Sequence, residues 1–178
     1  ILRRLVGSEM CIRDSFAIKH NIPVTQTVMG YSTMKRDHSH FLGPIGGLGG
    51  KAANNLAKQT DLAIAVGTKL ADFTTGSWAN FENPDFSLVS VNVSRFDASK
   101  HLAQSVIGDA KVSLQELSNA LGDWKAPDEW HKKSRDELKN WNDYVDKESG
   151  PTNQELPSYA HAVGAVSYTH LTLPTNPE

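Results

Sequence analysis

Two glycine-rich segments contain the residue types best suited to holding a ligand. The first, residues 42–50, reads Leu-Gly-Pro-Ile-Gly-Gly-Leu-Gly-Gly and precedes a helical pattern. Glycine allows positive φ and a close approach of the backbone to another surface, and the N–H groups at a helix start can hold a phosphate. However, the segment lacks a G-x-G-x-x-G pattern in a strand–turn–helix context. Close packing of the loop at an interface is therefore the favoured interpretation.

The second segment, residues 67–76, directly follows the apolar run 61–66, which has the length of a buried strand. Ligands bind beyond the carboxyl ends of strands in parallel α/β sheets, so this segment is the better ligand candidate. Asp72 could accept a hydrogen bond from a ligand or cap a neighbouring helix. Asn92 and Asp97 follow the next apolar run and could reach a ribose, although both residue types are common in turns.

Two histidines beside an aspartate raise the question of a metal site. His38 and His40 are two residues apart and follow Asp37. A metal needs further ligands, and none is evident from the spacing. We therefore favour a solvated loop, and no Ser/His/Asp set has a recognisable catalytic context.

Composition excludes several classes of protein. The chain has 178 residues and a net charge of −2 without a basic block, which gives no electrostatic argument for nucleic-acid binding. No apolar run reaches the length of a membrane span, so no membrane partner is expected. Cys11 is the single cysteine, which forbids an internal disulfide and fits a reducing cytoplasm.

The two ends differ from the rest. Residues 1–15 and residues 167–178 resemble translated sequencing-adaptor read-through, and the alternative is an ordinary frayed terminus. We treat both as non-native tails and expect few contacts between them and the core.

The remaining sequence alternates short apolar runs with helical patterns. Strands are predicted at 24–28, 62–66, 88–93 and near Val106, and helices at 51–59 and 110–121. This alternation predicts an α/β fold, with a Rossmann-like, mainly parallel sheet flanked by helices. No strand–turn–helix unit precedes Phe16, so the sheet is expected to lack its first strand. Asp109 is placed to cap the second helix and Gly122 to end it.

A different pattern begins after Gly122. Residues 123–150 predict a long amphipathic helix, with Pro127 at its start. Its apolar stripe, interrupted by Ser134, is expected to cover a surface of the domain, and comprises Trp130, Leu138, Trp141 and Val145. Residues 151–166 read as a linker and the beginning of another helix, capped by Ser158.

Residues 16–122 contain a series of short landmarks. They are Ile22-Pro23-Val24, Thr27, Gly30, Asp37-His38, Leu42-Gly43-Pro44, Gly46, Ala53-Asn54, Asp61-Leu62, Ala65-Val66-Gly67 and Gly108-Asp109-Ala110. This series resembles the central domain of thiamine-diphosphate-dependent enzymes, the family of acetolactate synthase and pyruvate oxidase. Further details, in residues 67–78 and 156–166, are similar to a member that opens a cyclic 1,2-dione in myo-inositol catabolism.

The resemblance implies a parent enzyme that hydrolyses a carbon–carbon bond of a small cyclitol-derived substrate with thiamine diphosphate and Mg²⁺. In that family the activating glutamate lies in an amino-terminal domain. The Gly-Asp-Gly motif that holds the diphosphate and Mg²⁺ lies in a carboxyl-terminal domain, and this chain contains no such motif. No catalytic residue is therefore assigned here, and the chain alone is expected to be inactive and to bind no cofactor. The implied partners are these two domains and further subunits of a homo-oligomer.

Some relatives bind FAD or another nucleotide on the central domain. The matching positions here are Gly46, Gly47, Gly67 and Asp109. Two other functions stay open at this point. One is a stand-alone nucleotide-binding module, and the other is a domain that joins subunits through the Trp-rich helix.

Overall fold

The computed structural model describes residues 8–31 and 33–167. It divides into two compact units, of which the first ends at Leu138 and the second begins at Lys139. The first unit contains five strands: β1 (Val24–Gln26), β2 (Phe41–Pro44), β3 (Leu62–Val66), β4 (Ser87–Asn92) and β5 (Gln104–Ile107). Its helices are α1 (Ser8–His20), α2 (Lys51–Ala57), α3 (Asp72–Thr75), α4 (Arg95–Ala98), α5 (Ala110–Leu121) and the first part of α6 (Asp128–Ser149), with short 3₁₀ turns at Val28–Gly30 and Lys100–Leu102.

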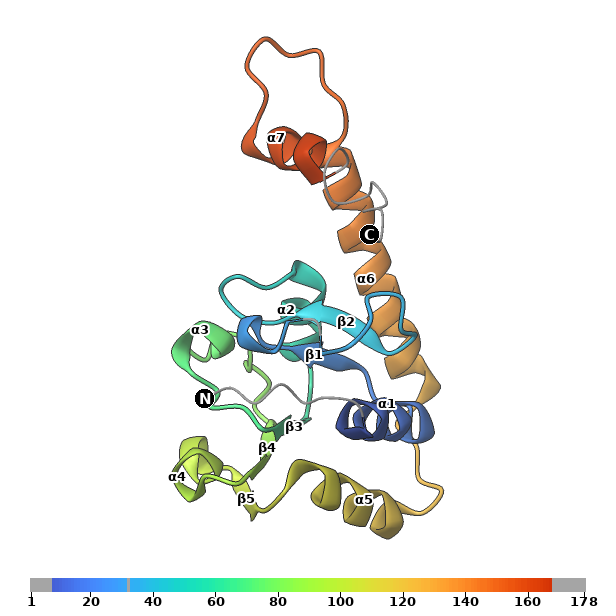
Figure 1. Cartoon of the computed structure of the whole chain (residues 1–178), viewed down its shortest axis with the longest axis vertical. Coiled ribbons are helices and arrows are strands. Elements are labelled where there is room, and N and C mark those ends of the chain that lie inside the picture. Colours follow the sequence, from blue (N-terminus) through green and yellow to red (C-terminus); the bar gives the residue numbers. More distant parts are fainter. Residues whose placement is uncertain (1–7, 32, 168–178) are drawn as a thin grey trace, which may run out of the picture. The chain divides into compact units, whose positions relative to one another are not determined.

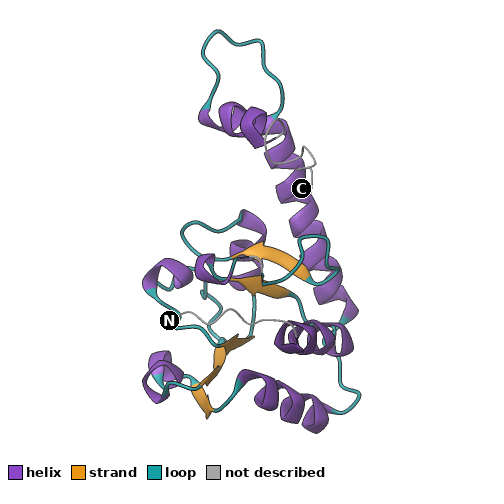
Figure 2. Cartoon of the chain, viewed as in Figure 1, coloured by secondary structure: helices purple, strands orange, loops and turns teal. Residues whose placement is uncertain are grey.

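Strand β4 is the centre of the larger sheet. It pairs in parallel with β3, where Ile64 is opposite Val89, and with β5, where Val91 is opposite Val106. A strand paired on both sides is the most protected, and Leu88, Ser90 and Val91 of β4 are all buried. The predicted parallel α/β class is confirmed (Figures 1 and 2).

The strands form two sheets, whereas the sequence predicted one. Strands β1 and β2 pair in parallel with each other, and within the described residues no strand hydrogen-bonds to both β1 and β3. Strand β2 itself was not predicted, because Gly43 and Pro44 read as turn residues. Proline is tolerated at the edge of a sheet, and β2 has only β1 as its partner among the described strands. The expectation of an absent first strand stays a prediction.

Helices α1 and α5 lie side by side and are joined by a buried histidine (Figure 1). His20 is fully buried, and its two ring nitrogens lie 2.7 Å from the Trp124 carbonyl oxygen and 2.8 Å from Ser118 Oγ. Helix α1 begins at Ser8, inside the segment treated as a tail. Arg13 in it donates a 2.5 Å hydrogen bond to the Thr33 carbonyl, so the expectation of few contacts fails at this residue. The origin of residues 1–15 stays a prediction, and residues 1–7 and 168–178 lie outside the described residues.

The ends of α5 follow from local chemistry. Asp109 Oδ1 accepts hydrogen bonds from the N–H groups of Lys111 and Val112, each at 3.0 Å, and Gly122 takes a φ of 58° just past the last turn. Both predicted end signals, and the range 110–121, are confirmed. In the second unit, helix α7 (Tyr159–Val166) is capped by Ser158, also as predicted.

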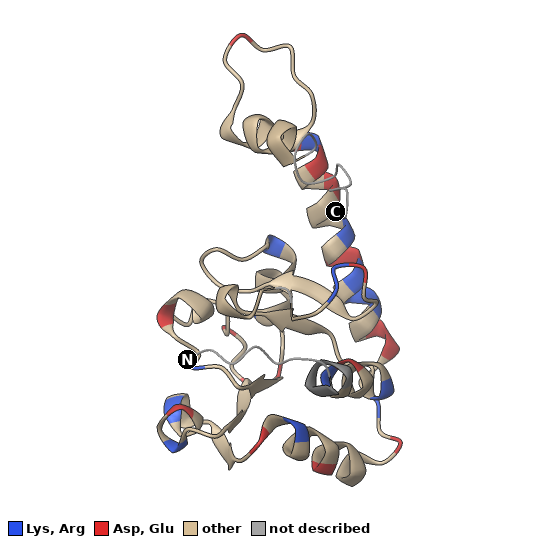
Figure 3. Cartoon of the chain, in the orientation of Figure 1, with Lys and Arg blue, Asp and Glu red and all other residues tan. Residues whose placement is uncertain are grey.

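Helix α6 carries charged residues along much of its length (Figure 3). Its buried positions are Ser134 and Leu138, both in the first unit. Ser134 interrupts the apolar stripe, but its buried hydroxyl is satisfied because it donates a 2.6 Å hydrogen bond to the His131 carbonyl. Trp141 and Val145 belong to the second unit, where Val145 is 36% exposed. Of the predicted stripe, only Leu138 is buried. Among the described helices, none combines the length and the apolar content needed to cross a bilayer.

Burial of Leu138 predicts that Leu138→Ala lowers the free energy of unfolding by about 2–4 kcal/mol, since it removes core contacts and leaves a cavity. Val145→Ala, on the same helix but exposed, should change it by about 0.5 kcal/mol or less. Urea unfolding followed by circular dichroism measures both. Equal losses in the two variants would contradict the assignment of Leu138 to the core.

Candidate functional site

The carboxyl edge of the β3–β4–β5 sheet gathers several of the residues that the sequence selected. Because the three strands are parallel, the segments that follow them meet at one edge. The strand ladder extends into this edge, where the Gly67 N–H donates to the Val91 carbonyl at 2.9 Å and the Gly108 N–H to the Asn92 carbonyl at 3.2 Å. Gly67 and Asp109, two of the four predicted nucleotide-binding residues, therefore lie at the same end of this sheet.

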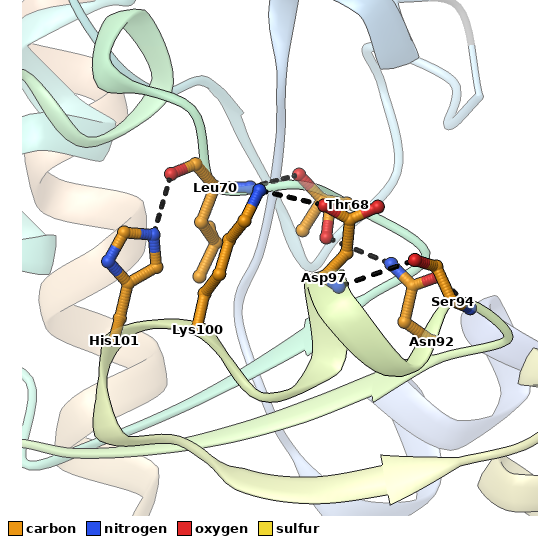
Figure 4. Close-up of polar contacts among 7 residues, drawn as sticks. All are labelled: Thr68, Leu70, Asn92, Ser94, Asp97, Lys100 and His101. Carbon is orange, nitrogen blue, oxygen red and sulfur yellow. Dashed lines mark hydrogen bonds and ion pairs between the residues drawn. The ribbon is translucent and has the colours of Figure 1, made fainter.

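Asn92 links the loops that follow β3 and β4 (Figure 4). Its side chain is 9% exposed, and its Nδ2 donates to the Thr68 carbonyl at 3.1 Å. Its Oδ1 accepts from the Ser94 N–H at 3.0 Å. Both ends of the amide are engaged inside the protein, which favours the turn-stabilising role over contact with a ribose.

Asp97 belongs to a small charged group on the same edge. Its carboxylate accepts a 2.8 Å hydrogen bond from Lys100 Nζ, and its N–H donates to Ser94 Oγ at 3.3 Å (Figure 4). The Lys100 hydrogen bond lowers the pKa of Asp97, so the carboxylate stays ionised under ordinary conditions. The Lys100 ammonium also lies 4.4 Å from the centre of the Phe96 ring. The group therefore presents a neutralised ion pair beside an exposed aromatic ring.

The backbone is strained at several residues in the segments that follow β3 and β4. Non-glycine residues with positive φ occur in the segments after β3 and β4, and they are Leu70, Ser77, Trp78, His101 and Leu102. His101 and Leu70 contact each other, because His101 Nε2 donates to the Leu70 carbonyl at 3.1 Å (Figure 4). The His101 ring also meets Trp78 edge-on, with 4.4 Å between the ring centres. Positive φ in such residues is uncommon, and it concentrates at binding sites and switch regions.

Gly46 and Gly47 lie in a loop that packs against α3. At Gly46, where φ is 107°, an added Cβ would lie 2.2 Å from the Phe73 carbonyl oxygen. The Gly47 N–H donates to that same oxygen at 2.8 Å. From the sequence, no strand was expected directly before this loop, but in the structure the loop directly follows β2. The apolar pair Phe41-Leu42 was the signal that could have indicated this strand. Only a residue without a side chain fits at Gly46.

The N–H groups of this loop are engaged within the protein. Gly46 N–H donates to Asn54 Oδ1 at 2.9 Å, and Asn54 Nδ2 returns a 3.0 Å bond to the Gly46 carbonyl. The Gly49 and Gly50 N–H groups donate to the carbonyls of Gly46 and Pro44, each at 2.9 Å. A phosphate at this loop would have to displace such bonds. The geometry favours the packing interpretation, and nucleotide binding by Gly46, Gly47, Gly67 and Asp109 stays a prediction.

The remaining candidates have local partners. Asp72 is the first residue of α3, and its carbonyl accepts the Gly76 and Ser77 N–H groups. His38 and His40 lie together beside α6, and their ring centres are 5.8 Å apart. Within residues 8–31 and 33–167, no group of three or more His, Cys, Asp or Glu side chains is arranged to hold a metal ion. Sequence spacing alone gave no sign that His131 joins this pair.

The contrast between two glycines gives a test of the loop packing. Gly46→Ala should lower the free energy of unfolding by about 2 kcal/mol or more beyond the loss in Gly43→Ala, because it adds a backbone clash to the φ strain. Gly43 has a similar φ of 100°, but an added Cβ there has nothing within 4 Å. Urea unfolding of both variants measures the difference. A Gly46→Ala variant as stable as Gly43→Ala would show that the contact with Phe73 is wrong.

Comparison with known proteins assigns the family. The family model described as "Thiamine pyrophosphate enzyme, central domain" matches residues 13–117. A 3D-(3,5/4)-trihydroxycyclohexane-1,2-dione hydrolase of Clostridium perfringens strain 13 is 48% identical over 106 residues, which cover 60% of this chain and 17% of the relative. The protein of the same name in Geobacillus thermodenitrificans is 36% identical over 161 residues, which cover 84% of this chain and 25% of the relative.

The matched region thus spans a quarter or less of these two relatives. Residues 13–117, which the family model matches, include the β3–β4–β5 edge and the Gly46 loop. The family match covers more than half of the 178 residues. The chain belongs to the thiamine pyrophosphate enzyme family, of which it carries part of the central domain.

Proposed function

We propose that the chain is the central part of a longer thiamine-diphosphate-dependent hydrolase that opens a cyclic 1,2-dione in myo-inositol catabolism. The observation that carries this proposal is the match to relatives named trihydroxycyclohexane-dione hydrolases at 36–48% identity. The substrate class, a small polyhydroxylated cyclic dione, comes from the names of those relatives. The role of this chain within the parent is structural, as a scaffold and an interface.

The residues of this chain do not fit thiamine diphosphate with Mg²⁺. The sequence has no Gly-Asp-Gly motif, and the described residues contain no cluster of carboxylates or histidines suited to a metal. The cofactor carries the carbon–carbon chemistry, so we assign it, together with Mg²⁺, to amino- and carboxyl-terminal domains of the parent. No catalytic step is assigned to residues of this chain.

The exposed carboxyl edge supports an interface role. Large apolar side chains are exposed around it: Phe73 and Phe96 are 70% and 75% exposed, and Leu102 is fully exposed. Large exposed apolar side chains are candidates for contact surfaces, and the strained backbone at Leu102 and His101 adds to that argument. We propose that this edge contacts other domains of the parent. A homo-oligomeric parent in the cytoplasm is also part of the proposal, on the family resemblance and the single cysteine.

A nucleotide site is the second candidate function. Gly67 and Asp109 lie at one sheet edge, and Gly46 and Gly47 pack on α3, which follows Gly67 in the chain. Against this reading, Asp109 Oδ1 already accepts two N–H groups of α5. Calorimetric titration of the chain with FAD and NAD distinguishes the two functions. Binding that Gly67→Val abolishes would favour the nucleotide module.

Because the proposal assigns thiamine diphosphate and Mg²⁺ to other domains of the parent, it predicts that this chain alone is inactive. Incubated with thiamine diphosphate, Mg²⁺ and the cyclic dione, the purified chain should open the ring no faster than a cofactor-only blank. Calorimetry should detect no micromolar binding of thiamine diphosphate. Turnover above the blank would place the catalytic groups in this chain and overturn the proposal.

The matched experiment uses the longer gene product encoded with its genomic flanks. It should open the dione in the presence of both cofactors, and the flanks should encode a Gly-Asp-Gly motif downstream. Failure of the longer protein to act on the dione would refute the substrate class, while activity there and not in this chain would support the scaffold role.

A further inference from the structure

Three histidines join the loop before β2 to the first turns of α6. The ring centres of His40 and His131 are 4.3 Å apart, and those of His38 and His40 are 5.8 Å apart. His40 is 7% exposed, and its Nε2 lies 3.3 Å from Asn21 Oδ1 at the end of α1. His131 Nε2 lies 3.2 Å from the Ser39 carbonyl oxygen. Residues from α1, the loop and α6 therefore meet at His40.

The hydrogen bonds indicate which ring nitrogens of His38 and His40 donate and which accept. Asn21 Nδ2 donates to the Ala126 carbonyl, so its Oδ1 is the acceptor and His40 Nε2 carries a proton. His40 Nδ1 then accepts from the Ser39 hydroxyl at 2.9 Å. His38 Nδ1 accepts the His40 backbone N–H at 3.1 Å. A proton on His38 Nδ1 would remove its bond from the His40 N–H, whereas the Ser39 hydroxyl can turn and accept from a protonated His40 Nδ1. The cost of a charged His40 ring therefore comes from its burial and its neighbours.

Cationic groups surround His40. His131 and Arg135 approach from α6, and His38 approaches from its own loop. Arg135 is held in place because its Nη1 donates to the carbonyls of Ser39 and Phe41, at 3.2 and 3.3 Å. One carboxylate, Asp128 at the start of α6, is linked to His40 through Asn21, whose Nδ2 lies 3.0 Å from Asp128 Oδ1. A proton on His40 would therefore face three groups that carry or can acquire positive charge.

We propose that His38, His40 and His131 form an acid-released clasp, which holds the first turns of α6 against the loop before β2 while the buried His40 ring is neutral and releases them when His40 is protonated. The clasp is independent of the proposed catalytic function. It makes the position of residues 128–138 responsive to pH.

The direction of the pH effect follows from linkage. Burial, followed by the charges of His131, His38 and Arg135, lowers the pKa of His40 from 6.5 to about 4. A group whose folded pKa is depressed stabilises the closed state fully above its unfolded pKa, and this contribution is lost as pH falls toward the folded pKa. The clasp is therefore closed above about pH 6.5 and weakens between pH 6.5 and pH 4.

Other contacts of α6 do not share this dependence. Leu138 is buried, Asn55 Nδ2 donates to Glu137 Oε2 at 3.1 Å, and Lys133 contacts Gln59. None of these groups is a histidine. Acidification should therefore loosen the start of α6, around His131 and Arg135, before the sheet unfolds.

Hydrogen exchange of the 178-residue chain tests the clasp. Between pH 7.5 and pH 5, the protection of the amides of residues 131–138 should fall about thirtyfold after correction for intrinsic exchange. This factor follows from a His40 pKa near 4 in the closed state and 6.5 in the open state. The amides of β4 should lose much less. Equal loss at α6 and β4 would mean global acid unfolding and would refute the clasp.

Two variants and one control sharpen the result. His40→Gln retains a donor toward Asn21 but cannot be protonated, so the pH-dependent loss at α6 should disappear. His161→Gln, in the second unit, should behave like the wild type.

If His40→Gln does not fold, NMR titration of the histidine ring signals replaces it. The pKa of His40 must then lie far below 6.5, the α6 opening must follow its titration, and His131→Gln must raise the pKa of His40. An ordinary His40 pKa, or an α6 opening that does not follow it, would overturn the proposal.

Discussion

The close approach of Gly46 to the backbone of Phe73 is the contact on which the arrangement of the first unit depends. The β1–β2 and β3–β4–β5 sheets share no strand pairing in the described residues, so loop and helix packing must join them. The Gly47 N–H bond to Phe73 and the paired bonds between Gly46 and Asn54 fix the loop from both sides. A side chain at Gly46 would separate the loop from α3. This constraint explains glycine at a position that the sequence alone made a phosphate-binding candidate.

Local signals in the sequence predicted the elements that depend on local chemistry. Helix α5 and its two ends were found because an Asp cap and a Gly stop act within one turn. Strand β2 was missed because Gly43 and Pro44 look like a turn unless the partner strand is known. The division into two sheets was missed for the same reason, since pairing depends on residues far apart in the chain. The parallel direction, in contrast, followed from the alternation of strands and helices.

The candidate site shows a similar division. Gly67 was expected just after a strand because the apolar run before it could be read from the sequence, and Asp109 was expected as the cap of the following helix. The partners of Asn92 and the strained backbone at Leu70 and His101 could not be read, because they depend on how two loops meet. The polar side chains of Asn92, Asp97 and His101 bond to other groups at this edge. The polar residues that the sequence selected as ligand candidates therefore serve mainly to hold the edge in shape. This role agrees with a scaffold better than with a catalytic centre.

The same argument applies to the histidines. His38 and His40 looked like an incomplete metal site because only their spacing was visible, and the third member, His131, comes from a distant helix. Metal binding would need the ring nitrogens free, yet His38 Nδ1 and both nitrogens of His40 are occupied by the Asn21, Ser39 and backbone groups around them. The His40 ring is instead buried among His38, His131 and Arg135, and this environment favours its neutral form. A buried imidazole with satisfied hydrogen bonds and cationic neighbours responds to protons, and the sequence could not reveal this response because it arises from the meeting of α1, the loop and α6.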